Sequence, residues 1–375
     1  MIHFFPRYSK TADASPFGQT LRALRVPHRI IATHVQQTFK YQFQLLLSVY
    51  PRLAWSALTT AMQSMLSRSG PPPDAVVIGS DVEVLMFALV RMLPFAARPR
   101  IVFLSFIFTQ RSRSIVNRLR LLYYRFVMRR VSCAICHSPL EIDRYRNLFA
   151  GCGTEFVFVP WGGYVPPVAD VIAWAGEAGS GTPRLVSAGR SGRDYPTLAA
   201  AAELAGCCST IICNELAALG GVAPSATIDV LSDCFGMDYL AQLLQAAVVV
   251  VPLRVEDISA GQMVLIQAMA LARPLIVTQT PTVGSYLQDG VNALLVPRGD
   301  VAAMAEAIRR LIDNPSEASA MGRRAQADYA AHFSIEAHLR ALIRAIEQHC
   351  GLEMAAQDRY AANPAPPERR PAAPR

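Results

Sequence analysis

A polar loop between two strongly apolar segments, over residues 246–278, constrains the fold of this chain most. Residues 246–252 predict a buried strand. From Glu256 to Val277 the chain then runs from a polar loop into an apolar helix and, through Arg273-Pro274, into another buried strand. Strand, loop, helix and strand form the repeating unit of a doubly wound parallel sheet. Such sheets bind ligands where loops leave the carboxyl ends of the strands.

The start of the expected helix has the features of a ligand-binding loop. Backbone N–H groups at Ser259, Ala260 and Gly261 have no intrahelical partner there, which suits a diphosphate or a sugar hydroxyl. Polar residues between two apolar elements indicate that the segment lines a ligand-binding site, so we include Gln262 in this loop. A simple N-cap by Ser259 is the alternative, and the two roles are compatible.

Length and composition indicate two domains without a membrane-spanning segment. A chain of 375 residues is too long for one ordinary core. Hydrophobic residues make up 52% and charged residues 17% of the chain. This content is rich for a soluble protein, and the mean hydropathy of +0.25 favours contact with a membrane surface. The most apolar stretch, 84–97, is short and is interrupted by Arg91 and Pro94.

The N-terminal residues and the cysteines indicate the cytosol. Residues 2–6 predict a first strand and no signal peptide, so we expect a cytosolic location. Cys133 and Cys136 have CxxC spacing, but in a strand their side chains point to opposite faces. No second pair with zinc spacing follows, so we interpret the cysteines as small buried hydrophobic residues.

The positive charge is carried almost entirely by arginine. The net charge is +8, and Lys10 and Lys40 are the only lysines. Arginine-rich surfaces favour anionic partners such as phosphates, nucleotide sugars or acidic lipid headgroups. No basic patch with interleaved aromatic residues and no helix-turn-helix pattern is present, so we expect no nucleic-acid partner.

Alternation of strands and helices predicts parallel sheets in both halves. The expected strands are 2–6, 29–33, 74–78, 101–108, 131–136 and 156–159, followed by 184–188, 227–231, 248–251, 275–278 and 293–297. Expected helices are 43–65 with a break at Pro51, a basic helix at 111–130, 301–314, and 335–348.

Four sequence signatures resemble one enzyme superfamily. They are residues 186–195, 292–300, His332-Phe333-Ser334 and 158–162. They resemble the retaining, nucleotide-sugar-dependent glycosyltransferases of the group 1 superfamily (family-4-like), most strongly over 184–345. The resemblance implies an α/β fold with two Rossmann-like domains facing each other across a cleft, the GT-B architecture.

This resemblance implies a domain plan. Residues 1–161 would form an acceptor-side Rossmann-like domain, 162–183 a linker, and 184–334 the domain that binds the nucleotide-sugar donor. A helix at 335–350 would return to the first domain, and the tail 363–375, rich in proline, alanine and arginine, is expected to be disordered.

The implied function is transfer of a hexose, with retention, from a nucleotide-diphosphate sugar to a hydroxyl acceptor. The acceptor would be a saccharide or a lipid-linked saccharide. No metal and no cofactor are expected, because arginines offset the phosphate charge. The alternatives are a nucleotide-sugar epimerase on the same architecture and a catalytically inactive scaffold.

The donor loop departs from the superfamily pattern. Two glutamates normally stand eight positions apart, where this chain has Ser259 and Gln267. Gln267 still accepts a hydrogen bond through its carbonyl, but without charge. The superfamily's phosphate-binding lysine is also missing, and Arg193 is its natural replacement.

From these patterns we expect a diphosphate clamp of Arg190 and Arg193, which follow a strand, unless they belong to a solvated loop. Asp81 follows a first-domain strand and would orient or deprotonate the acceptor hydroxyl, or else only cap the next helix. The full set of expected donor-binding residues is Gly189, Arg190, Arg193, Asp233, Ser259, Ala260, Gly261, Gln262 and Gln267.

The basic helix at 111–130 has two interpretations. Its apolar residues Ile115, Leu119, Leu122, Tyr123 and Phe126 share an arc flanked by arginines. That pattern suits peripheral contact with an anionic membrane, at the inner face of the cell membrane. It also suits a core helix whose arginines reach solvent from its edges. As a description of the structure, we favour this second interpretation.

Overall fold

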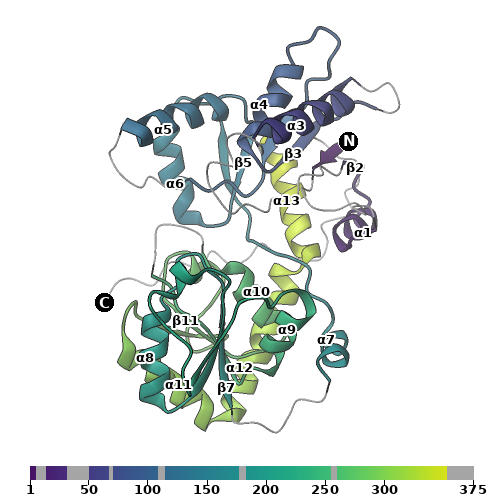
Figure 1. Cartoon of the computed structure of the whole chain (residues 1–375). Coiled ribbons are helices and arrows are strands. Elements are labelled where there is room, and N and C mark those ends of the chain that lie inside the picture. The colour runs from purple at the N-terminus through teal and green to yellow at the C-terminus, as the bar shows by residue number, and fades with distance from the viewer. Residues whose placement is uncertain are drawn as a thin grey trace. The chain divides into compact units, whose positions relative to one another are not determined.

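The computed structural model describes residues 1–5, 14–31, 50–66, 71–108, 115–176, 183–254 and 260–352. They form two compact units, each with its own sheet (Figure 1). Of the described residues, unit 1 comprises those up to Val159 and those from Leu339 to Leu352, and unit 2 runs from Pro160 to His338. Each sheet has six strands and every pairing is parallel, so the predicted α/β class with two Rossmann-like sheets is confirmed.

Unit 1 has the strand order β2-β1-β3-β4-β5-β6. Its strands are β1 (Ile2–Phe4), β2 (His28–Ile30), β3 (Ala75–Ile78), β4 (Arg100–Phe103), β5 (Cys133–Cys136) and β6 (Glu155–Phe158). The helices are α1 (Pro16–Ala23), α3 (Tyr50–Met65), α4 (Asp81–Val90), α5 (Ile115–Met128), α6 (Pro139–Leu148) and, from Leu339 onward, α13 (Ile335–Cys350).

Unit 2 has the strand order β12-β11-β10-β7-β8-β9. Its strands are β7 (Arg184–Ala188), β8 (Cys208–Ile212), β9 (Ile228–Leu231), β10 (Val248–Val251), β11 (Leu275–Thr278) and β12 (Leu294–Val296). Its helices are α7 (Val168–Ala175), α8 (Tyr195–Ala205), α9 (Gly236–Gln245), α10 (Gln262–Ala270), α11 (Val301–Asp313) and α12 (Pro315–Asp328), with short turns η2 (Leu216–Leu219), η3 (Val283–Ser285) and η4 (Tyr329–Phe333).

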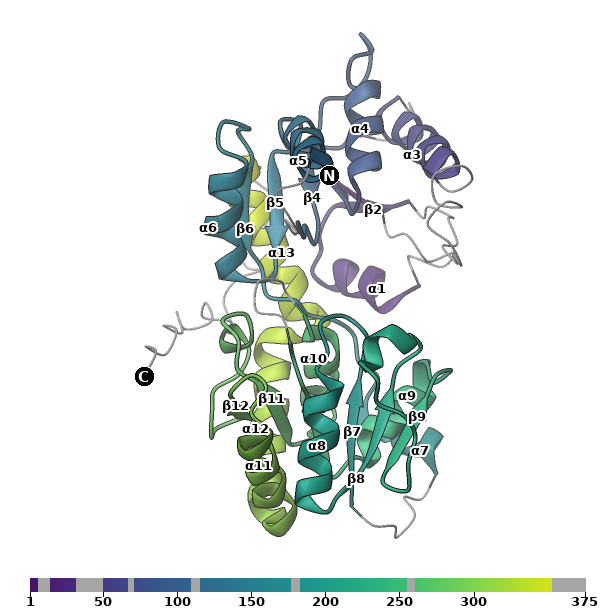
Figure 2. The same ribbon diagram turned by 60° about the vertical axis from the view of Figure 1, so that its left-hand side comes forward.

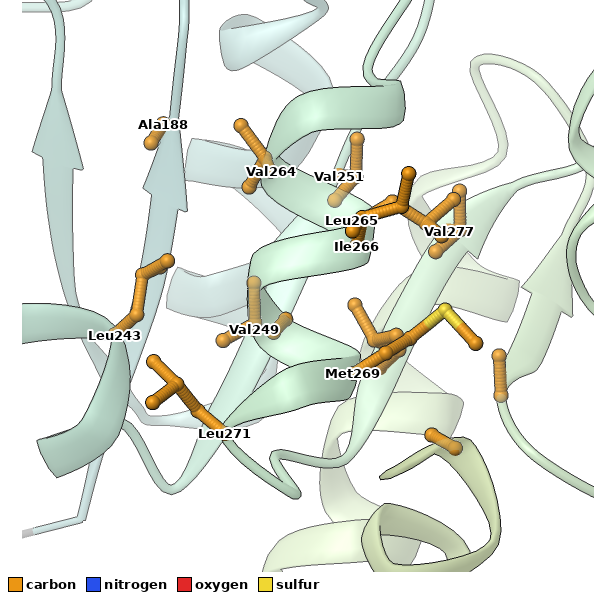
Figure 3. Close-up of a cluster of buried hydrophobic side chains, with 14 of the residues drawn as sticks. Ala188, Leu243, Val249, Val251, Val264, Leu265, Ile266, Met269, Leu271 and Val277 are labelled. Atoms are coloured by element: carbon orange, nitrogen blue, oxygen red, sulfur yellow. The ribbon is translucent and has the colours of Figure 1, made fainter. Parts of the chain in front are cut away.

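Both faces of the unit 2 sheet are buried, which explains its continuous runs of valine. Val249 and Val251 pack with α10 in one cluster, whereas Val248 and Val250 pack with α8 and α11 in another. Successive strand residues point to opposite faces, so a strand covered on both sides needs apolar residues at every position. Figure 3 shows the first cluster, in which side chains of α10 lie against those of β7, β10 and β11.

Several predicted segments differ in detail. The expected strand 101–108 ends at Phe103, because Ser105 adopts a left-handed φ of 57° that breaks the extended backbone. Pro51 lies in the first turn of α3, whereas residues 43–49 of the expected helix lie outside the described residues, and the stretch 162–183 contains α7. Cys133 and Cys136 are buried in β5, as expected.

Candidate functional site

The strand order of unit 2 reverses next to β7. The chain passes from β7 to β8 and β9 on one side, and β10, β11 and β12 then follow on the other side. The connections after β7 and β10 therefore leave the sheet in opposite directions, and open parallel sheets bind ligands at the carboxyl ends of strands at such a reversal. The residues that follow β7 and β10 form the candidate site.

The loop after β7 begins with a glycine that the backbone geometry requires. Gly189 has a φ of 103°, which residues with a side chain rarely adopt. Its N–H donates to the carbonyl oxygen of Ile212 at 3.0 Å, and its own carbonyl oxygen accepts the hydroxyl proton of Tyr195. These two contacts fix the loop on the end of the sheet.

Arg193 is buried at the end of this loop, with 4% of its surface exposed. Its Nε donates to the carbonyl oxygen of Ala188 at 2.8 Å, and Nη1 donates to that of Ser191 at 2.9 Å. The Arg193 backbone also forms a bridge to Leu253, just after β10. The guanidinium is therefore held by the end of β7 and the loop that follows it, and the Arg193 backbone joins this loop to the one after β10.

The charge of Arg193 is not neutralised by any carboxylate of the described residues. Its side-chain partners are carbonyl oxygens and the Tyr195 hydroxyl. Burial lowers the pKa of Arg193 below its usual value, because the charged form loses hydration. A buried cation without a counterion is unfavourable, so this position is suited to an anionic ligand.

The start of α10 lies beside Arg193. A Cβ atom added at Gly261 would lie 3.7 Å from Nη1 of Arg193. Gly261 is the N-cap residue with a φ of 89°, and it has no side chain with which to cap the first turn. The amide Nε2 of Gln262 is buried without a hydrogen-bond partner, while Ala260 is buried next to it. Two kinds of donor, backbone and side chain, are thus available beside a cation.

Gln267 lies further along α10 and contacts α9. Its Oε1 accepts a hydrogen bond from the hydroxyl of Tyr239 at 3.0 Å. Gln267 is half-buried, so it does not simply face solvent. The carbonyl of the amide is already in use as an acceptor, which is the capacity expected of this residue.

The other predicted donor residues are less well placed. Arg190 is exposed, and its Nη1 lies 3.9 Å from Oε2 of Glu215. Asp233 follows β9, which β8 separates from β7, and it accepts a hydrogen bond from Ser232 on the surface. Ser259 lies outside the described residues. The structure therefore brings together Gly189, Arg193, Ala260, Gly261 and Gln262.

In unit 1 the strand order reverses between β1 and β3. Asp81 opens α4 directly after β3, and its carboxylate accepts a hydrogen bond from the hydroxyl of Tyr123 at 2.9 Å. The cap of this helix is made by other residues. Ser80 Oγ accepts from the N–H of Glu83 at 3.2 Å and donates to its carboxylate at 2.9 Å. Asp81 is therefore not needed as the cap, and its acceptor role stays a prediction.

A serine and a histidine at the same edge of the unit 1 sheet were not predicted. Ser105 follows β4 in its left-handed conformation, and its hydroxyl lies 2.8 Å from Nε2 of His137, which follows β5. Nδ1 of His137 lies 2.8 Å from the carbonyl oxygen of Val159, so it carries the proton. Nε2 then accepts the Ser105 proton. The position of His137 directly after a buried strand was the available signal.

Within the described ranges, no group of three or more His, Cys, Asp or Glu residues is placed to hold a metal ion. No helix among the described residues has the length and apolar character needed to cross a membrane.

Comparison with known proteins finds one family that matches part of unit 2. Residues 214–314 match the family described as "Glycosyl transferases group 1", and this match includes β10, α10 and β11. The expected resemblance to this superfamily is confirmed, and the fold is that of GT-B glycosyltransferases.

Individual relatives are more distant. The alpha-D-kanosaminyltransferase of Streptomyces kanamyceticus is 32% identical over 89 residues, 24% of this chain and 22% of that protein. The aligned stretch thus spans about a fifth of that relative. Sucrose-phosphate synthase of Thermosynechococcus elongatus has a TM-score of 0.65 at 16% identity, with 92% of this chain and 98% of that chain covered. The Anabaena protein HepE in complex with UDP-glucose has a TM-score of 0.56 at 14% identity, with 94% and 99% covered.

Proposed function

We propose that this protein is a retaining glycosyltransferase that moves a hexose from a nucleotide-diphosphate sugar to a hydroxyl acceptor without a metal ion. The observation that carries the proposal is the buried guanidinium of Arg193, which no carboxylate of the described residues neutralises, beside the glycine that begins α10. The HepE structure, which is similar in fold, contains UDP-glucose, a donor of this class.

The expected chemistry needs electrostatic stabilisation. The bond between the anomeric carbon and the diphosphate oxygen breaks, and the acceptor oxygen bonds the anomeric carbon on the same face. The acceptor proton passes to the departing diphosphate. Negative charge therefore grows on the leaving group, where a fixed cation and preorganised N–H donors lower the barrier.

Each residue of the unit 2 site has a role in this proposal. Arg193 and the N–H groups at the start of α10 bind the diphosphate, and Nε2 of Gln262 donates to a phosphate or sugar oxygen. Gln267 and Tyr239 form a neutral pair for a ribose hydroxyl. Arg190, being exposed, provides a weaker electrostatic contribution.

The acceptor side of the proposal belongs to unit 1. Asp81 and the Ser105–His137 pair lie at the carboxyl edge of its sheet and bind or activate the acceptor hydroxyl. The acceptor class we propose is a saccharide, free or lipid-linked. Contact with an anionic membrane belongs to the same proposal.

Release of nucleoside diphosphate from a panel of UDP-, GDP-, ADP- and dTDP-hexoses tests the activity. We expect release from at least one donor, unchanged by EDTA and lost in Arg193→Gln but not in Arg190→Gln. Proton NMR of the freshly released or transferred hexose reports the anomeric configuration, which should match that of the donor. Interconversion of sugar isomers without release would indicate an epimerase. Binding without either reaction would indicate a scaffold.

A further inference from the structure

An open hollow of about 840 Å³ lies in unit 1 at the amino ends of β4, β5 and β6. This is the sheet edge opposite to the one that carries Asp81, Ser105 and His137. Glu155 is the only carboxylate among the lining residues. Basic side chains dominate the lining: Arg91, Arg98, Arg100, Arg129, Arg130 and His349.

The charge of this hollow is largely unbalanced. Among the described residues, the side chains of Arg91, Arg98, Arg100 and Arg129 have no hydrogen-bond or ion-pair partner. Arg130 lies over the ring of Phe126, 3.6 Å from its centroid, which leaves its charge uncompensated too. Arginines gathered around a single carboxylate repel one another and favour an anionic partner.

Exposed apolar side chains border the hollow. Met92, which lines it, is 81% exposed, and Phe95, in the same loop, is 93% exposed. Helix α5 also reaches the hollow, through Phe126. Its outward side has an apolar stripe at helical spacing. The exposed members of the stripe are Ile115, Val116, Leu119, Leu122 and Phe126.

The exposure of this stripe contradicts the interpretation of the basic helix as a core helix. A core helix would bury residues at such spacing, but α5 buries Val127 and Met128 and leaves the stripe in solvent. Arg111 and Arg113 lie outside the described residues. α4 and α5 are neighbours in unit 1 (Figure 2), and Met92 of the loop after α4 and Phe126 of the stripe both line the hollow. A large exposed apolar patch marks an interaction site.

We propose that this face of unit 1, residues 89–98 together with the outward side of α5, docks on an anionic phospholipid surface. Headgroup phosphates occupy the arginine-lined hollow, and Phe95 and Met92 insert at the level of the acyl chains. Unpaired cations beside protruding apolar side chains complement a surface that is anionic outside and apolar beneath. The inference rests on the membrane contact of the proposed function and names the face that makes it, and the vesicle tests do not depend on the proposed transfer activity.

Vesicle flotation with the full chain tests the docking. Vesicles of phosphatidylcholine are compared with vesicles containing one part phosphatidylglycerol in four. We expect binding to the anionic vesicles only, and weaker binding as NaCl rises, because exposed charges are screened beyond about 8 Å at physiological salt. Binding to neutral vesicles alone, or no binding at any salt concentration by the folded protein, would overturn the proposal.

Paired variants separate the effect of this face on binding from the effect of the net charge of the chain. Arg98→Gln with Arg129→Gln should weaken binding about 25-fold, since each arginine near an anionic surface contributes about fivefold. Arg323→Gln with Arg324→Gln removes the same charge from exposed positions of α12 and should leave binding unchanged. Equal losses in both pairs would show that net charge alone acts and would contradict a docking face.

The apolar part has its own control. Phe95→Ser should weaken binding about tenfold, because a ring leaves its apolar environment, whereas Leu216→Ser, at an equally exposed position of unit 2, should have no effect. Phe95→Trp should show a blue-shifted emission with anionic vesicles. An unshifted emission, or inorganic phosphate displacing the protein at millimolar concentration, would indicate free phosphate as the ligand. A dimer disrupted by Phe95→Ser would assign the face to a second copy.

Discussion

Gly189 and Arg193 are packed so closely that a side chain at one position would displace the other. A Cβ atom at Gly189 would lie 2.5 Å from Nη2 of Arg193. The guanidinium cannot easily move away, because Ala188 and Ser191 hold it through their carbonyl oxygens. The orientation of the buried cation thus depends on the absence of a side chain four residues earlier.

Gly189→Ala should therefore impair the donor site without removing any functional group. We expect nucleoside diphosphate binding to weaken at least tenfold, because the new side chain displaces Arg193. The unfolding free energy should fall by about 1–3 kcal/mol, because alanine is strained at a φ of 103° and contacts Arg193. Calorimetric titration and chemical denaturation measure the two effects. Gly299→Ala is the control: it also has a positive φ, 70°, but open space around it, so it should lose stability and keep binding.

Gln267→Glu should restore the charge that the superfamily pattern has at this position. A carboxylate accepts hydrogen bonds from ribose hydroxyls more strongly than an amide does. We expect tighter binding of nucleoside diphosphate, by about threefold to tenfold, with the Tyr239 hydroxyl still available as a donor. Tyr239→Phe should change affinity less. Weaker binding by Gln267→Glu would show that the neutral amide is required there.

His137→Asn should affect the acceptor step and leave the donor step intact. The imidazole orients and polarises the Ser105 hydroxyl, and an asparagine at this position loses the Nε2 acceptor. We expect transfer to fall about 100-fold, as for misplacement of a reacting group, with unchanged nucleoside diphosphate affinity. Ser105→Ala should give a similar pattern. Equal transfer rates in the parent and both variants would show that the pair only joins β4 to β5.

Burial of His3 should make the protein less stable in mild acid. Burial, Arg29 and the N-terminal amine lower its pKa from 6.5 to about 4. Between these pH values the unfolded chain binds a proton that the folded chain does not, so stability falls as pH falls from 6.5 to 4 and is unaffected above. Burial lowers the pKa of His338 as well. Melting temperatures at pH 7.5 and 5.0 should differ less in His3→Gln than in the parent, while the exposed His349→Gln should behave like the parent.

The buried strands of unit 2 are the part of the fold most fully predictable from the sequence. β7, β10 and β11 have the predicted bounds, because strands covered on both faces require continuous apolar runs. β8 was not predicted, since its run of cysteine, serine, threonine and isoleucine has no helical or strand period of its own. α12 was missed because Pro315 marks a stop signal as well as a helix start.

The candidate site was predictable only where it follows a strand directly. Gly189 and Arg193 were found in this way, and so was the loop before α10. The contact between Tyr239 and Gln267 joins two helices, and no local pattern specifies it. The left-handed conformation of Ser105 and its contact with His137 depend on the packing of β4 against β5, which the apolar run after β4 does not reveal.

The central claim is that Arg193 is a buried anion-binding cation, and calorimetric titration of UDP, GDP and ADP tests it most directly. We expect the parent to bind at least one of them, and Arg193→Gln to bind it about 10- to 100-fold more weakly, as for loss of a charge-assisted hydrogen bond. Arg190→Gln should stay within about threefold, because exposed charges are screened. If Arg193→Gln binds the nucleotide as tightly as the parent, the diphosphate is bound elsewhere and the account is wrong.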